Sequence, residues 1–252
     1  MKWRLLLTGY KDAHTNMALD ESIMIHVGQE VSPPTIRLYG WSPPAVSIGY
    51  FQGLEEEVDL KMCENLGIDY VRRITGGGAV FHESEVTYSL SIPEISPLIP
   101  HNILESYRVL CQGIIEGLSA LGIVAEFVPL NDIIVNNKKI SGSAQTRRNR
   151  TVLQHGTVLI DTDVKKMFSI LKVPSEKIKD KLIKDVKERV TSITRTLSRE
   201  VSFEDVCLAL AKGFERSLNI ELEEGELVDT EIELAKEIKR DRYSNRIWNH
   251  RR

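Results

Sequence analysis

Three consecutive glycines, Gly76, Gly77 and Gly78, follow Arg73 and Thr75 in the stretch RRITGGGAVFHES. Glycine lacks a Cβ atom, so its backbone adopts positive φ angles and lets a ligand approach closely, while successive N–H groups face an anion. With a cation and a hydroxyl beside it, this loop suits an anionic ligand that lies across a sheet. The alternative is a glycine-rich turn with a pair of surface arginines.

The residues after the glycines argue against two common phosphate-binding loops. A Walker A loop needs Gly-Lys-Ser/Thr at the start of a helix, and a dinucleotide-binding loop needs GxGxxG at the start of a helix. Here the chain continues from Ala79 as AVFHESEVTYSL, which is typical of a strand. The glycines are therefore expected to join two strands.

A second group of polar residues lies in NDIIVNNKKISGSAQ, residues 131–145. Because side chains alternate along a strand, Lys138 and Lys139 are expected to point to opposite faces, so that one lies toward the interior or a cleft. The small residues Ser141 and Gly142 leave room for a ligand beside it. A lysine held there stabilises phosphate and carbonyl oxygens as they gain negative charge. In the alternative interpretation, both lysines are solvated side chains that follow a turn.

Four further polar residues have two interpretations each. Asn131 and Asp132 could bind a hydrated Mg²⁺, but Asn-Asp is equally a turn pair. His82 and His155 could each act as an acid, a base or a phosphate contact, although a single histidine in a strand is more often structural.

Composition excludes several classes of protein. The chain has 252 residues, of which 42% are hydrophobic and 27% charged, as in an ordinary globular protein with a substantial core. A net charge of -3 argues against bulk binding to nucleic acid or to an anionic membrane. No apolar run reaches the roughly 18 residues of a membrane-spanning helix, and the N-terminal apolar stretch is too short for a secretory signal. We therefore expect a cytoplasmic protein.

The three cysteines do not form a recognisable site. Cys63, Cys111 and Cys207 are widely spaced, odd in number and without a CxxC pair. This pattern argues against a disulfide framework and against a zinc site. Each cysteine is expected to be a small buried residue.

Strand-like and helix-like stretches alternate along the chain, which indicates an α+β protein with a mixed, largely antiparallel sheet flanked by helices. A helix is expected to begin at Thr15 as N-cap, and two others to end at Gly67 and Gly122. Asn136-Asn137 tolerates positive φ and predicts a tight hairpin. The expected helices cover residues 16–27, 55–67, 104–122, 164–173, 203–218 and 230–244, and the expected strands cover 35–41, 45–51, 69–73, 79–92, 132–135, 138–144 and 151–161.

The chain has no repeat, low-complexity tract or obvious linker. We expect one domain over 1–252, in which a helical C-terminal part, 164–252, packs on a sheet-rich core, 1–163. No C-terminal accessory domain is expected.

The motifs RRITGGGAVFH, NDIIV, KKISGSAQ and LQHGTVLID, in this order, resemble the lipoate-protein ligase A family. Octanoyltransferases are close relatives of that family, and biotin protein ligases are distant ones. TNMALDESI, IRLYGW, IGYFQ and RYSNRIWN also fit, so the resemblance covers nearly the whole chain. It implies the class II synthetase-like fold of biotin and lipoate ligases. It also implies a two-step reaction, in which lipoate and ATP give lipoyl-AMP and the lipoyl group then passes to an acceptor lysine.

The resemblance also implies roles for individual residues. Lys139 would be the catalytic lysine that contacts the acyl carbonyl and the phosphate, and Asp132 would bind Mg²⁺ beside the nucleotide. The implied residues of the substrate and adenylate site are Arg73, Thr75, Gly76, Gly77, Gly78, Ala79, His82, Asn131, Asp132, Ser141, Gly142 and His155.

The resemblance implies partner proteins as well. Acceptors would be lipoyl domains, such as those of 2-oxoacid dehydrogenase E2 subunits, or the glycine cleavage H protein. Because the chain stops at Arg252, soon after IWNHRR, it resembles the bipartite form of the ligase, which a separate small accessory protein completes.

An octanoyl-[carrier protein]-protein octanoyltransferase is the alternative function. HESEVTYSL and GSAQTRRNRTVLQHG are closer to those transferases, which use a nucleophilic cysteine and no ATP. In the branch with the closest pattern the nucleophile precedes the lysine hairpin, yet AEFVPLNDIIV contains no cysteine, which favours the ligase. A non-catalytic relative that binds lipoylated or biotinylated partners is disfavoured by the presence of Arg73, the glycines and Lys139. A biotin ligase is disfavoured because RRITGGGAV stands in place of a GRGRxG-type loop.

Overall fold

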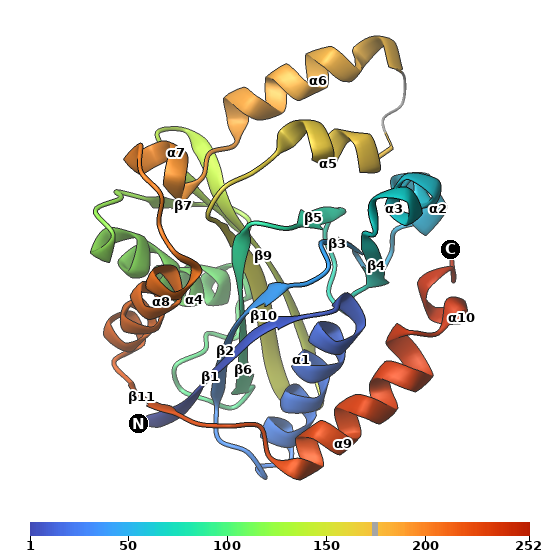
Figure 1. Ribbon diagram of the computed structural model, residues 1–252. Coiled ribbons are helices and arrows are strands. Elements are labelled where there is room, and N and C mark those ends of the chain that lie inside the picture. The colour runs from blue at the N-terminus through green and yellow to red at the C-terminus, as the bar shows by residue number, and fades with distance from the viewer. Residues whose placement is uncertain (173–175) are drawn as a thin grey trace.

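The computed structural model describes residues 1–172 and 176–252, and its centre is a mixed sheet of eight strands (Figure 1). Most neighbouring strands in this sheet are antiparallel, but β1 pairs in parallel with both β2 and β11. In spatial order the strands are β11 (Glu221–Glu224), β1 (Lys2–Lys11), β2 (Thr35–Trp41), β6 (Glu85–Pro93), β10 (Thr151–Leu159), β9 (Lys138–Arg148), β8 (Asp132–Val135) and β7 (Glu126–Val128).

A second sheet has three strands, in the order β4 (Asp69–Arg72), β3 (Ala45–Ile48) and β5 (Val80–His82). β3 is parallel to β4 and antiparallel to β5, so the glycine-rich loop connects the two outer strands of this sheet. The expectation that the glycines join two strands is confirmed.

Helices cover both faces of the large sheet (Figure 1). On one face, α4 (Ile103–Ala120) and α8 (Phe203–Leu218) pack on the apolar side chains of β2 and β6, among them Ile36, Leu38 and Leu90. On the other face, α1 (Ala13–Gly28) contacts the alternate residues of β2, including Arg37 and Tyr39. The two-residue period of each strand therefore separates an apolar layer from a polar one.

The remaining helices extend these two layers. α9 (Asp229–Ile238) lies beside α1, and α5 (Val164–Ile170) and α6 (Glu176–Arg189) lie together beyond β5 and β9 (Figure 1). The other helical segments are α2 (Leu54–Glu57), α3 (Leu60–Leu66), α7 (Ile193–Leu197), the π-helical η1 (Lys239–Tyr243) and α10 (Arg246–Asn249).

The N-cap of α1 is Asp12, so the expectation of Thr15 is wrong. The Asp12 carboxylate accepts a hydrogen bond from the Thr15 backbone N–H at 2.9 Å, which places Thr15 in the first turn. Aspartate caps a helix as well as threonine does, and the first apolar residue of the helix, Ala13, comes earlier than the sequence pattern indicates.

The hairpin prediction is confirmed. Asn136 and Asn137 have φ angles of 49° and 61° and form the two-residue turn between β8 and β9. The register shifts just beyond the turn, because Ile133 pairs with Ser141 and Ile134 with Lys139. Such a β-bulge re-aims the side chains next to it.

Other expected elements differ in extent. Residues 55–67 form parts of two helices, α2 and α3, and the second ends at Gly67 with φ of 63° as predicted. α5 ends at Ile170, and the last residue of the helix predicted over 164–173, Val173, lies outside the described residues. β11 was not predicted, because the stretch ELEE resembles a charged loop.

The C-terminal part contributes to the same layers as the N-terminal part. β11 pairs with β1, and α8 packs along α4. Whether residues 1–163 and 164–252 act as distinct parts remains a prediction. Among residues 1–172 and 176–252, none of the helices combines the length and apolar character that a membrane crossing requires.

Candidate active site

A cavity of about 300 Å³ lies between the two sheets and is closed in part by α5 and α6. The glycine loop, β9 and β10 supply its polar lining. Side chains from β2, β5, β9, β10 and α5 supply much of its apolar lining, namely Trp41, Val80, Phe81, Ile140, Leu159 and Met167.

Most of the candidate residues border this cavity. Ten of them line it: Arg73, Gly77, Gly78, Ala79, His82, Asn131, Lys139, Ser141, Gly142 and His155. Thr75, Gly76 and Asp132 do not line it, but Thr75 contacts His155, and Gly76 and Asp132 are next in sequence to Gly77 and Asn131. The functional roles of all thirteen residues remain predictions.

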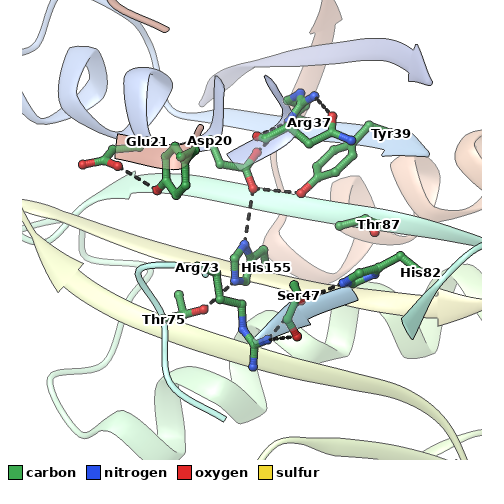
Figure 2. Close-up of polar contacts among 12 residues, drawn as sticks. Asp20, Glu21, Arg37, Tyr39, Ser47, Arg73, Thr75, His82, Thr87 and His155 are labelled. Atoms are coloured by element: carbon green, nitrogen blue, oxygen red, sulfur yellow. Dashed lines mark hydrogen bonds and ion pairs between the residues drawn. The ribbon is translucent and has the colours of Figure 1, made fainter. Parts of the chain in front are cut away.

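Arg73 holds the glycine loop in shape and also contacts Ser47 (Figure 2). Its buried guanidinium donates hydrogen bonds to the carbonyl oxygens of Gly76 at 2.9 Å and Gly78 at 2.7 Å, and to both oxygens of Ser47 at 3.0 Å. Burial lowers the pKa of Arg73 to about 10. Gly77 has φ of +97°, and a Cβ there would lie 2.9 Å from the guanidinium, so this position requires glycine.

The neighbouring Arg72 is fully buried as well, so the alternative of a surface arginine pair is wrong. Its guanidinium donates to the Gly49 carbonyl at 3.2 Å, the Tyr50 carbonyl at 3.1 Å and the Asn249 carbonyl at 2.8 Å. It therefore joins the C-terminal helix α10 to the end of β3.

Lys139 lies at the rim of the cavity. Its Nζ is 2.7 Å from Oδ1 of Asp132, and both side chains are partly exposed, by 44% and 34%. A Cβ at Gly142 would lie 2.8 Å from this Nζ, so the glycine makes room for the lysine. The neighbouring Lys138 does not line the cavity.

The donor set around Asp132 does not fit a resident Mg²⁺. Asp132 already pairs with Lys139, and the Asn131 side-chain amide donates to the Ser143 carbonyl. Mg²⁺ requires several oxygen ligands in octahedral geometry. Among the described residues, the group of carboxylate and histidine side chains close enough to share an ion lies elsewhere, at Asp12, His14 and Asp69.

His155 belongs to a closed polar array (Figure 2). Its Nε2 lies 2.7 Å from Thr75 Oγ1 and its Nδ1 lies 3.3 Å from Asp20 Oδ2. Asp20 also accepts from Arg37 at 2.8 Å and from the Tyr39 hydroxyl at 2.9 Å. Burial would raise the pKa of Asp20, but the bonds from His155 and Arg37 lower it. Burial lowers the pKa of His155, against the opposing effect of Asp20.

His82 belongs to a second array, of which the sequence indicated only the histidine. Its Nε2 lies 2.7 Å from Ser47 Oγ, and its Nδ1 lies 2.7 Å from Glu85 Oε1. The Thr87 hydroxyl donates to the same carboxylate oxygen at 2.7 Å. The Trp41 ring stacks on the imidazole with centroids 4.0 Å apart. The signal for this array was the alternation of polar residues in EVTYSLS, on the face of β6 opposite its apolar residues.

All three cysteines are buried and none lines the cavity, which confirms their expected character as buried residues. Burial raises the pKa of Cys63 and of Cys111 to about 11, and that of Cys207 to about 12. The Sγ of Cys111 lies 3.5 Å from Oγ of Ser143, a residue that lines the cavity. These thiols lack the exposure and low pKa of a reactive cysteine.

Comparison with known proteins defines the class. The family model for the lipoyl protein ligase A/B catalytic domain matches residues 12–215. The chain therefore belongs to this enzyme family, and the predicted fold is confirmed. A bi-partite lipoate protein ligase from Thermoplasma acidophilum, described with its E2 lipoyl domain, has a TM-score of 0.89 at 34% identity, covering 99% of this chain and 96% of that one. A lipoate-protein ligase A bound with ATP has a TM-score of 0.84 at 31% identity, covering 99% of each chain.

The similar curated proteins are named for a different reaction. The octanoyltransferase LipM of Geobacillus kaustophilus is 40% identical over 99% of this chain and 98% of its own length. LipM of Bacillus subtilis is 33% identical, with the same coverage. Each alignment spans 273 positions, more than the 252 residues of this chain, so these relatives carry residues without a counterpart here.

These names overturn the ATP-dependent ligase as the expected function, and with it the support for lipoyl-AMP and for ATP as a substrate. Protein lipoylation and acyl transfer remain consistent with the relatives. The expectation was wrong because it gave decisive weight to one missing cysteine, over the longer stretches HESEVTYSL and GSAQTRRNRTVLQHG. A nucleophile is one side chain, whereas those stretches contribute several residues to the cavity lining, among them His82, Gly142 and His155.

Proposed function

We propose that this chain is an acyltransferase that moves an octanoyl group from a carrier-protein thioester to one lysine of an acceptor domain. The observation that carries the proposal is the apolar cavity between the two sheets, with Lys139 at its rim, in a chain whose full-length relatives are named octanoyltransferases.

The cavity suits a medium-length acyl chain. Its volume of about 300 Å³ is at the lower end for small-molecule sites, and Trp41, Phe81, Leu159 and Met167 provide apolar walls. Burial of each methylene of an acyl chain against such walls contributes about 0.8 kcal/mol. A long-chain acyl group would exceed the space available.

The rim of the cavity suits the charge that acyl transfer develops. When an amine attacks a thioester, negative charge builds on the carbonyl oxygen, and pre-positioned donors stabilise it. Lys139 provides a cation there. Within the described residues, the backbone N–H groups of Gly77 and Gly78 donate no hydrogen bond, so they remain available to an anion. Arg73 contributes by holding the loop in position.

The acceptor we propose is a lipoyl domain, by analogy with the Thermoplasma acidophilum protein described with its E2 lipoyl domain. An E2 subunit of a 2-oxoacid dehydrogenase and the glycine cleavage H protein are both suitable acceptors. The separate accessory subunit expected from the ligase interpretation has no part in this proposal.

The proposal is tested by acylation of a lipoyl domain, followed by intact mass. The purified chain is given octanoyl carrier protein without ATP, and in parallel octanoate or lipoate with ATP and Mg²⁺. We expect transfer from octanoyl carrier protein, and none to a domain whose acceptor lysine is changed to arginine. Transfer that occurs only with ATP and a free acid would overturn the proposal.

A further inference from the structure

Two histidines in this site have the same type of surroundings, with a hydroxyl on one ring nitrogen and a carboxylate on the other. In one array Thr75 and Asp20 flank His155, and in the other Ser47 and Glu85 flank His82. Such a hydroxyl–imidazole–carboxylate arrangement is recognised by its geometry and by the roles of its members. The two arrays differ in their access to the cavity.

In the array of His155 the histidine lines the cavity but its hydroxyl partner does not. Thr75 is completely buried and does not line the cavity, and Asp20 is shared among His155, Arg37 and Tyr39. In the other array, both Ser47 and His82 line the cavity. Ser47 faces it because side chains alternate along β3, which turns the neighbouring Val46 into the apolar cluster beneath α2 and α3.

We propose that Ser47, His82 and Glu85 form the proton relay of acyl transfer, with His82 as the base for the attacking amine. The inference rests on the proposed acyl transfer to a lysine amine, and it assigns residues to the deprotonation that this reaction requires. Unlike the transferases that use a nucleophilic cysteine, this chain has no cysteine in AEFVPLNDIIV and its three cysteines are buried, so transfer is direct, without an acyl-enzyme intermediate.

The hydrogen bonds define a direction for the proton. Because ionised Glu85 only accepts hydrogen bonds, His82 presents Nδ1–H to it and leaves Nε2 free to accept from the Ser47 hydroxyl. The Arg73 guanidinium donates to the same serine oxygen at 3.0 Å, and Ser47 itself lines the cavity. The Trp41 ring, stacked at 4.0 Å, fixes the plane of the imidazole.

One carboxylate contacts the His82 ring directly. Glu85 is its direct partner, and the second carboxylate oxygen of Glu85 is buried with no hydrogen bond in the described part of the chain. Within the described residues, the other ionisable groups that line the cavity are Tyr39, Arg73, Lys139 and His155. Of the ionisable side chains in the described part of the chain, Glu85 is the one that hydrogen-bonds to the imidazole.

In the proposed step, the lysine nitrogen of the acceptor forms a bond to the acyl carbonyl carbon, and the carbon–sulfur bond of the thioester breaks. The proton of the attacking nitrogen passes to Ser47 Oγ while the serine proton passes to His82 Nε2. The imidazolium then returns a proton to the departing thiolate through the same serine. An amide and a free thiol result, and no external oxidant or reductant is consumed.

The test is the pH dependence of single-turnover transfer by the full chain and its variants His82→Gln, Glu85→Gln and Ser47→Ala. His101→Asn serves as the matched control, because His101 is exposed and outside the cavity. We expect His82→Gln to lose on the order of 100-fold or more in rate. In the wild type, a plot of log rate against pH should have a slope of two at acidic pH, where both the amine and the histidine must lose a proton. At higher pH, where only the amine must lose a proton, the slope should be one. The His82→Gln profile should keep a slope of one throughout.

A second measurement separates chemistry from folding. Imidazole added to His82→Gly should restore transfer in a saturable manner, because the small ring replaces the missing base in the space under Trp41. An unchanged break in the pH profile of His82→Gln, or failure of imidazole to restore transfer to a folded His82→Gly, would overturn the assignment. So would an octanoyl adduct on Ser47 after incubation with the donor alone, since it would make serine a nucleophile.

The relay and the proposed function can fail separately. The amine loses its proton whichever leaving group the acyl donor carries, so the same pH profiles can be measured with a synthetic activated octanoyl ester. If carrier-protein thioesters are inactive but the ester is used with the expected profiles, the relay stands and the donor assignment fails.

Discussion

Lys139 shares the rim of the cavity with Asp132, and the ion pair between them determines where the ammonium rests before substrate arrives. The pair is partly exposed, so solvent screens it and it contributes little to stability. The ion pair instead fixes the position of the lysine, because Asp132 holds Nζ in the space that Gly142 leaves free. The lysine is therefore available to turn toward a carbonyl oxygen that gains negative charge.

We expect Lys139→Ala to lower single-turnover transfer on the order of 100-fold, as removal of one electrostatic donor typically does. Lys138→Ala is the matched control, because Lys138 precedes it on β9 and does not line the cavity. Rates are compared by intact mass of the acceptor domain at saturating donor. Equal rates for the two variants would remove Lys139 from the mechanism.

The cysteines give a second prediction at the same scale. Their burial and the raised pKa of each thiol, about 11 for Cys111, predict slow alkylation of the native protein. Exposure to iodoacetamide at neutral pH should therefore leave transfer intact, while the unfolded chain takes up the label. Loss of transfer in step with labelling of Cys111 would instead indicate a thiol nucleophile reached by local opening.

Among the elements, α1 acts on the site through Asp20, which contacts Tyr39 and His155, two residues that line the cavity. Its position depends on the cap at Asp12, which accepts two hydrogen bonds from Thr15 and pairs with Lys239 at 3.0 Å. Burial would raise the pKa of Asp12, but these bonds lower it from 3.8 to about 2. The ionised cap therefore links the helix start to η1.

Because the folded pKa of Asp12 is depressed, its contribution is complete above the unfolded pKa of 3.8 and is lost as the pH falls through about 2. We expect Asp12→Ala to lower the free energy of unfolding by about 1 kcal/mol at neutral pH. The difference from wild type should shrink as the pH falls from 4 toward 2. Denaturant titrations at several pH values measure it, with Glu64→Ala, an exposed carboxylate on α3, as control. A constant difference across this range would exclude the ionised cap as its origin.

At the scale of the whole molecule, the site depends on contacts between the C-terminal end and the middle of the chain. Asn249 on α10 accepts the Arg72 backbone N–H at 2.8 Å and donates to the Tyr243 carbonyl at 2.7 Å. The Trp248 indole N–H donates to the Arg72 carbonyl at 2.8 Å. The last turn of the protein thus closes the edge of the small sheet that precedes the glycine loop.

We expect Asn249→Ala to destabilise the fold by about 1–3 kcal/mol, because it leaves the buried Arg72 N–H and Tyr243 carbonyl without partners. Ile247→Ala, on the same short helix but 81% exposed, should have little effect. Thermal unfolding of both variants is the measurement. Similar midpoints for Asn249→Ala and wild type would show that α10 closes the sheet without stabilising it.

The sequence by itself determined the local features. The strand–loop–strand around the glycines, the Asn136-Asn137 hairpin, the end of α3 at Gly67 and the burial of the cysteines depend on backbone preference or on nearby residues, so they could be read directly. The order of the motifs also predicted the family and its fold correctly.

Only the tertiary structure decided which side chains meet. The sequence placed Arg73 at the mouth of a ligand loop, but its hydrogen bonds go inward, to the loop itself and to Ser47 on another strand. Ser47 and His82 are 35 positions apart, and they touch because β3 and β5 are neighbours in a sheet. A two-residue alternation reveals which face of a strand is polar, but not which strand lies opposite. That choice depends on the packing of both sheets and their helices, to which every part of the chain contributes.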